Sequence, residues 1–129
     1  MVEVVRRDIV RFCATLLCGT LLFGSFAQAA SLESKAAKTF RKIGVGPEQT
    51  EAYVELYEKF LKSRNSQVRR VLKNAQGEQV SVMAKKKARR AARQSVKKMD
   101  TVLTELQLKY YAQYLEITNQ IFLREAGLR

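Results

Sequence analysis

The chain has 129 residues and a formal net charge of +12, and it contains neither histidine nor tryptophan. This length allows at most one modest domain. Its two cysteines, Cys13 and Cys18, lie in an N-terminal segment that we expect to be removed, so the mature chain would have no disulfide and no thiolate metal site. Without histidine, a mature cysteine or a glycine-rich phosphate loop, no catalytic set stands out. We therefore expect neither an enzyme nor a cofactor or metal site, and the charge favours an anionic partner.

Residues 1–29 have the pattern of an export signal. Residues 6–11 hold three arginines, residues 12–26 are apolar, and residues 27–29 (Ala-Gln-Ala) place small side chains at −3 and −1 of a cleavage after Ala29. The apolar run is shorter than the roughly 20 residues that a membrane-spanning helix needs. We expect a cleaved Sec-type signal peptide and a periplasmic protein, and retention of the segment as an anchor is the alternative.

Residues 30–46 are expected to form an N-terminal arm or a short helix. Ser31 and Ser34 can cap a helix, and Phe40 and Ile43 belong to a weak apolar side. Two glycines then interrupt the pattern. The helical domain proper is expected over residues 47–129.

A first long helix is predicted from Pro47, a residue favoured at the first helical position, to about Asn74, where Gly77 can take a left-handed cap. Its apolar residues recur at helical spacing: Tyr53, Leu56, Tyr57, Phe60, Leu61, Val68, Val71 and Leu72. Four glutamates form an acidic stripe along it: Glu48, Glu51, Glu55 and Glu58. We interpret this stripe as a solvated face, because a straight helix face cannot wrap a calcium ion.

The next helix, predicted over residues 78–101, combines a seam of small residues with a basic surface. The seam lies within roughly 100° of the helical wheel and consists of Val80, Ala84, Ala88, Ala91, Ser95, Met99 and Val102. The basic face consists of Lys85, Lys86, Lys87, Arg89, Arg90, Arg93, Lys97 and Lys98. Because alanine buries little apolar area, we expect this helix to be weakly anchored and mostly exposed. Its basic face is either a binding face for an anionic partner or only a solvated face.

The last helix is predicted to begin at Thr104, whose spacing to Gln107 fits a capping box, and to end near Glu125. Three long helices with one alanine seam make a thin core, and chains this small often gain stability by oligomerising. We therefore expect a homodimer. Its apolar interface is predicted to include Tyr53, Tyr57, Phe60, Tyr111, Tyr114 and Leu115.

A shift of 58 residues aligns residues 45–49 (VGPEQ) with residues 103–107 (LTELQ). Both segments contain an aliphatic residue, an N-cap, two further residues, a glutamine and then an aromatic helix. Any two capped amphipathic helices can align in this way. Together with the export signal and the basic helix, however, the pattern resembles the Spy/CpxP group of periplasmic stress proteins, which carry two Leu-Thr-x-x-Gln motifs. The resemblance covers roughly residues 43–122.

The two motifs supply the predicted structural helix caps, which are Gly46, Gln49, Thr104 and Gln107. The second motif is intact. The first departs from the family pattern, because Val45 replaces leucine and Gly46 replaces threonine, so Gln49 lacks a hydroxyl partner. This departure weakens the first cap.

The resemblance implies an all-α fold of long antiparallel helices, with two protomers in a curved helical-hairpin dimer that has a basic, partly apolar concave face. In that family the face acts as an ATP-independent chaperone for unfolded envelope proteins, and some relatives inhibit a sensor kinase. A zinc-binding branch does not carry over, because the mature chain has no histidine or cysteine. We expect a chaperone or envelope-stress adaptor whose basic face binds unfolded or acidic protein segments. Binding to an anionic surface, either membrane lipid or nucleic acid, is the alternative.

Overall fold

The computed structural model describes residues 27–128, and this part of the chain consists of four helices without a strand. The helices are α2 (Ala27–Ile43), α3 (Thr50–Asn74), α4 (Gln79–Met99) and α5 (Glu105–Glu125). The predicted all-α fold, with one N-terminal helix and three long helices, is confirmed. None of the helices in residues 27–128 is long and apolar enough to cross a membrane.

Most of the predicted signal peptide, residues 1–26, lies outside the described residues. α2 begins at Ala27, so the predicted cleavage site after Ala29 lies in its first turn. Within the segment expected to be an arm or a short helix, residues 30–43 are helical and belong to α2, which has 17 residues in all. Cleavage and export stay predictions.

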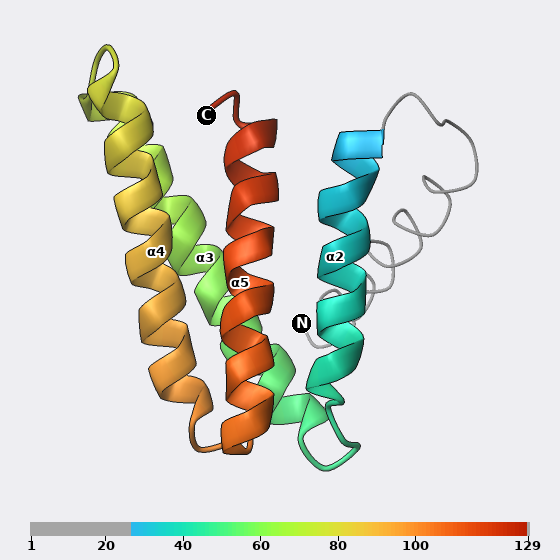
Figure 1. The fold of residues 1–129 in the computed structure, drawn as a ribbon. Coiled ribbons are helices and arrows are strands. Elements are labelled where there is room, and N and C mark those ends of the chain that lie inside the picture. The colour runs from blue at the N-terminus through green and yellow to red at the C-terminus, as the bar shows by residue number, and fades with distance from the viewer. Residues whose placement is uncertain (1–26, 129) are drawn as a thin grey trace.

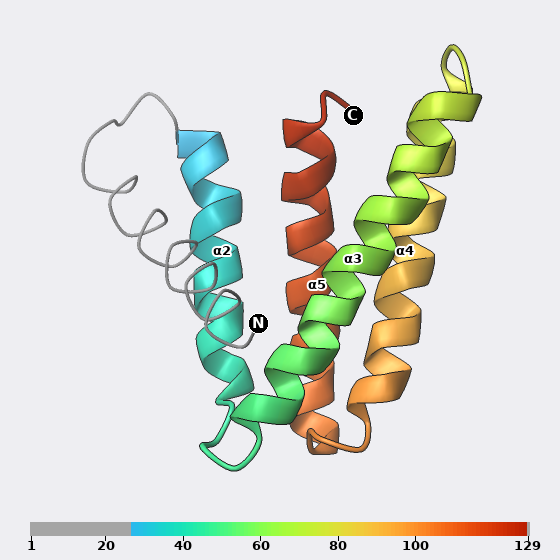
Figure 2. The ribbon, with the colours of Figure 1, turned by 180° about the vertical axis from the view of Figure 1, so that it is seen from behind.

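Successive helices run in opposite directions, so that the connecting turns lie at the two ends of the molecule (Figure 1). α3 and α4 form a hairpin closed by residues 75–78, and α5 packs against α4. α2 packs against the other side of α5, and α3 crosses behind α5 and α4 as seen in Figure 1, or in front of them in Figure 2. The segments 44–49 and 100–104 therefore meet at the end of the molecule opposite the α3–α4 turn.

The local sequence explains most helix ends. The Thr104 side chain accepts a hydrogen bond from the Gln107 backbone N at 3.3 Å, and Gln107 Oε1 accepts one from the Thr104 backbone N at 3.0 Å, which confirms the capping box. Gly77 takes the left-handed conformation (φ +77°) in the α3–α4 turn. α3 begins at Thr50, three residues after the predicted start at Pro47. The intervening residues form a turn in which the Gln49 N donates to the Gly46 carbonyl at 3.0 Å.

An aromatic cluster between α2, α3 and α5 makes the larger part of the core. The stacked rings of Tyr53 and Tyr57 lie 6.0 Å apart, and Tyr111 meets Tyr53 edge-on at 5.6 Å. Phe40 of α2 contacts Tyr114 at 5.5 Å between ring centroids. A smaller cluster lies in the half of the hairpin nearer the α3–α4 turn. It joins α3, α4 and α5 through Val68, Val71, Ala84, Ala88 and Leu123.

The predicted apolar interface is part of this core, which corrects the sequence prediction. Its six residues, Tyr53, Tyr57, Phe60, Tyr111, Tyr114 and Leu115, are only 0–7% exposed within the single chain. The physical reason is α2, which packs along α5 and brings Phe40 onto the aromatic face that had been expected to meet a partner. The homodimer itself stays a prediction, and those six side chains are not free to form its interface.

Candidate functional site

The eight basic residues predicted as a binding face surround the outer side of α4. The seam turns inward as predicted, with Ala84, Ala88, Ala91, Ser95 and Met99 buried. As a result seven of the eight cations are exposed, and Lys87 is half-buried. Their positions on the helix divide them into two groups of four.

One group lines a groove of about 840 Å³ between α4 and α5. Lys85, Arg89, Arg93 and Lys97 belong to this group. They recur every four residues, so successive cations rise roughly 6 Å along the helix axis at 1.5 Å per residue. The other group, Lys86, Lys87, Arg90 and Lys98, does not line the groove. The structure thus brings together half of the predicted basic face.

The rest of the groove lining is apolar or uncharged, with one exception. The apolar side chains are small or medium in size: Ala88, Ala92, Val96, Ala112 and Leu123. α5 adds Gln120, Asn119 and the carboxylate of Glu116. Four cations therefore face one carboxylate beside an apolar floor. Such a surface attracts anionic segments electrostatically and offers them apolar area to cover.

Asn119 holds the groove floor to its neighbours. Its Nδ2 donates a hydrogen bond to the Ala88 carbonyl of α4 at 3.0 Å, and its Oδ1 accepts one from Arg64 Nη1 of α3 at 3.4 Å. The side chain is 6% exposed, so both contacts are buried. One amide thereby joins the three long helices directly beneath the groove.

Arg64 is a buried cation that sequence reasoning missed. It is 6% exposed, and its guanidinium lies 4.0 Å from the Phe122 ring centroid and 5.2 Å from that of Phe60. Burial lowers the pKa of Arg64 below its ordinary value, because it disfavours the charged form. The signal was present in the sequence: Arg64 lies four residues after Phe60 and four before Val68, on the apolar spacing of the helix.

The two glutamines of the aligned motifs meet at the opposite end of the molecule from the α3–α4 turn. Gln49 Nε2 donates to Gln107 Oε1 at 3.0 Å, and Gln107 Nε2 donates to Gln49 Oε1 at 3.0 Å. Each amide also bonds to backbone groups. Gln49 Oε1 accepts from the Gly46 N at 3.0 Å, and Gln49 Nε2 donates to the Val102 carbonyl at 2.9 Å.

Gln107 mirrors this pattern. Its Oε1 accepts from the Thr104 N, and its Nε2 also donates to the Ile43 carbonyl at 3.0 Å and to the Gly44 carbonyl at 3.2 Å. Gly46 offers no hydroxyl, as expected, and α3 has no side-chain N-cap bond, so only the second motif is a capping box. The first motif supplies a cross-link instead. The predicted cap residues therefore hold the 44–49 and 100–104 segments together and lie away from the groove.

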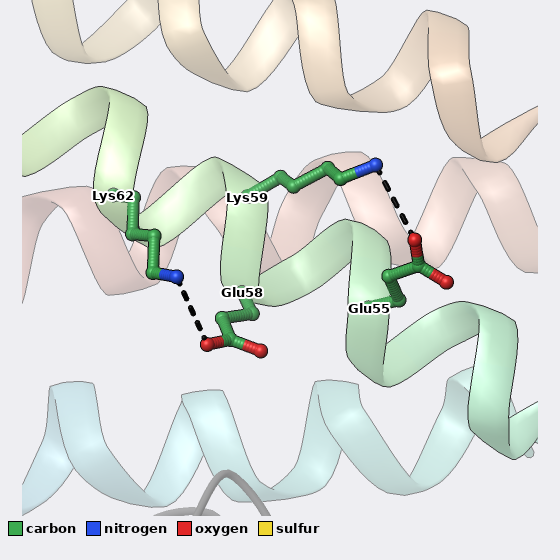
Figure 3. A network of polar contacts seen from close by, with 4 residues as sticks. All are labelled: Glu55, Glu58, Lys59 and Lys62. Atoms are coloured by element: carbon green, nitrogen blue, oxygen red, sulfur yellow. Dashed lines mark ion pairs between the residues drawn. The ribbon is translucent and has the colours of Figure 1, made fainter. Parts of the chain in front are cut away.

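The acidic stripe lies on the surface of α3. Glu48, Glu51 and Glu55 are exposed and Glu58 is half-buried. Glu55 pairs with Lys59 at 3.3 Å and Glu58 with Lys62 at 3.2 Å, each one helical turn further along (Figure 3). Pairs of this kind contribute little to stability. The interpretation of the stripe as a solvated face is confirmed by this exposure.

Comparisons with known proteins found no matching family model, no matching curated protein and no matching solved structure. The resemblance of the two glutamine motifs to the Spy/CpxP group stays a prediction.

Proposed function

We propose that this chain is a periplasmic, ATP-independent chaperone or envelope-stress adaptor that binds acidic or unfolded protein segments in the groove between α4 and α5. The observation that carries the proposal is the groove lining, with four cations at four-residue intervals beside small apolar residues. The export pattern of residues 1–29 supports the periplasmic location. The sensor kinase that some members of the resembled family inhibit remains a candidate partner.

The spacing of the groove cations suits clients without a fixed conformation. Successive cations lie roughly 6 Å apart along α4, which matches carboxylates four residues apart on a helix. An extended chain places alternate side chains about 6.6 Å apart, which is close to the same repeat. Acidic segments of either conformation can therefore match carboxylates to the groove cations, so the groove does not require one client conformation.

The energetics suit a chaperone that must release its client. Long-range attraction by the net charge of the chain speeds encounter with acidic segments. Once bound, exposed ion pairs are each worth only about 0–1 kcal/mol. The alanine-rich floor offers little apolar area per residue, so the client is held by many weak contacts and dissociates readily.

The test compares two variants of the full chain with the same loss of charge. The groove variant replaces Lys85, Arg89, Arg93 and Lys97 by glutamine. The control replaces Lys86, Lys87, Arg90 and Lys98 by glutamine on the same helix. Each is assayed without ATP for keeping a denatured acidic client soluble, at low and at high salt.

We expect the groove variant to need about tenfold more protein for the same protection, while the control stays within about twofold of the native chain. High salt should weaken protection by the native chain, because it screens exposed charges. Equal loss in both variants would show that net charge alone attracts the client. Full protection by the groove variant would refute the proposed binding site.

A further inference from the structure

The helix ends on either side of the α3–α4 turn carry large apolar side chains that the rest of the described chain leaves uncovered. Leu72 is 46% exposed in the last turn of α3, and Val82 and Met83 are 62% and 40% exposed near the start of α4. In both views this turn extends beyond the neighbouring ends of α5 and α2 (Figures 1 and 2). The end of the α3–α4 hairpin is therefore the outermost part of the described chain at that end of the molecule.

Four exposed cations lie further from the turn than these apolar residues: Arg69 and Arg70 on α3, and Lys85 and Lys86 on α4. A fifth, Lys73, lies one residue nearer the turn than Leu72. Glu78 is the only acidic residue between positions 69 and 86. Long basic side chains can reach past an apolar surface to polar groups beyond it. Leu72, Val82 and Met83 lie nearer the turn than Arg69, Arg70, Lys85 and Lys86. This order matches the layers of an anionic membrane, where acyl chains lie beneath phosphates.

We propose that the tip of the α3–α4 hairpin docks on a membrane surface that contains anionic phospholipid. Leu72, Val82 and Met83 enter the boundary between headgroups and acyl chains, and the cations behind them contact the phosphates. The alanine seam of α4 argues against the helix lying flat on a membrane, because such helices place large apolar residues opposite the charge. Docking by the tip does not need that length of apolar face. This inference does not rest on the proposed client groove.

A tryptophan reporter tests the tip directly, because the chain has no tryptophan of its own. Val82→Trp places one at the tip. Leu106→Trp is the matched control, since Leu106 is 63% exposed in the first turn of α5, at the other end of the molecule. Each full-length variant is mixed with vesicles of brominated phosphatidylcholine, with or without phosphatidylglycerol.

We expect Val82→Trp emission to shift to the blue and fall at least twofold with anionic vesicles, and to stay unchanged with phosphatidylcholine alone. Leu106→Trp emission should stay unchanged in both. The full chain includes residues 1–29, but attachment through this segment does not by itself bring Val82 into the lipid. No response of Val82→Trp to anionic vesicles, or an equal response of Leu106→Trp, would overturn the proposal. So would a response to an unfolded acidic protein with none to vesicles.

A second pair of variants tests the cations in the Val82→Trp background. The tip variant carries Arg69→Glu, Lys73→Glu and Lys86→Glu. Its control carries the same change at three exposed lysines on α2 and α5, namely Lys35, Lys38 and Lys109. Circular dichroism checks that both remain helical. The tip variant should need at least tenfold more anionic lipid for half-maximal quenching, and the control less than threefold more. An equal change in both would leave only non-specific attraction and refute a docking tip.

Discussion

Replacing Gln107 by alanine removes one amide that holds two distant turns together. The side chain makes four hydrogen bonds at 3.0 Å: Oε1 accepts from the Thr104 N and Gln49 Nε2, and Nε2 donates to Gln49 Oε1 and the Ile43 carbonyl. Three of these four bonds cross between segments more than fifty residues apart in the chain. The substitution therefore acts on tertiary structure as well as on the cap of α5.

The magnitude follows from the number and exposure of these bonds. A net value of about 1 kcal/mol per hydrogen bond would give about 4 kcal/mol for four. Gln107 is half-buried, so water can replace part of this, and we expect Gln107→Ala to lower the free energy of unfolding by about 2–3 kcal/mol. Thr104→Ala removes only the 3.3 Å cap bond and should cost about 1 kcal/mol.

Urea denaturation followed by circular dichroism measures these values, and a double-mutant cycle with Gln49→Ala isolates the direct pair. Since two hydrogen bonds join the amides, the double variant should lose about 1–2 kcal/mol less than the sum of the single variants. Additivity to within about 0.5 kcal/mol would show that the two side chains act independently. The glutamines would then be two separate caps, and our account of the cross-link would be wrong.

Two further predictions concern buried polar groups. Burial raises the pKa of Tyr111, against the opposing effect of its 2.7 Å hydrogen bond with Ser95. The protonated phenol is therefore favoured in the folded state, so the free energy of unfolding should be unaffected below pH about 10 and fall as the pH rises above it. Urea denaturation at several pH values measures this fall, which should be smaller in Tyr111→Phe than in the native chain. If the free energy of unfolding fell equally with pH in both, the prediction would be wrong. Arg64→Met keeps the packing against Phe60 and Phe122 and should change the free energy of unfolding by less than about 1.5 kcal/mol, while Arg64→Ala should lower it by about 2–4 kcal/mol. Equal losses in the two variants would mean that the guanidinium contacts, and not the packing, stabilise this position.

The features that could be predicted from the sequence are those with local causes. Helical spacing located the three long helices, the Thr104–Gln107 spacing indicated the start of α5, and the alanine seam indicated which side of α4 is buried. The contact between Gln49 and Gln107 could not be derived in the same way. Their alignment in the repeat says that two helices begin alike, and only tertiary structure brings the two helix starts together.

The candidate groove shows the same limit. The positions 85, 89, 93 and 97 repeat every four residues in the sequence, so they share one side of the helix. The seam shows which side of α4 faces inward, but it does not show which flank of α4 lies beside α5. The position of α5 is what separates the four groove cations from the other four. In the same way, a weak apolar pattern around Phe40 did not indicate that α2 would cover the tyrosine face.

The alanines of α4 explain both why the helix packs and why a groove remains beside it. Ala84, Ala88 and Ala91 allow close approach to the neighbouring helices, while Ala88 and Ala92, with Ala112 of α5, are too short to fill the space at the α4–α5 flank. The ion pairs among residues 27–128 lie within α3 and between α2 and α5, and none involves α4. Among these residues, the groove cations therefore do not hold α4 to its neighbours through ion pairs. Because surface changes of this kind usually alter stability by no more than about 0.5 kcal/mol each, their removal tests binding separately from folding.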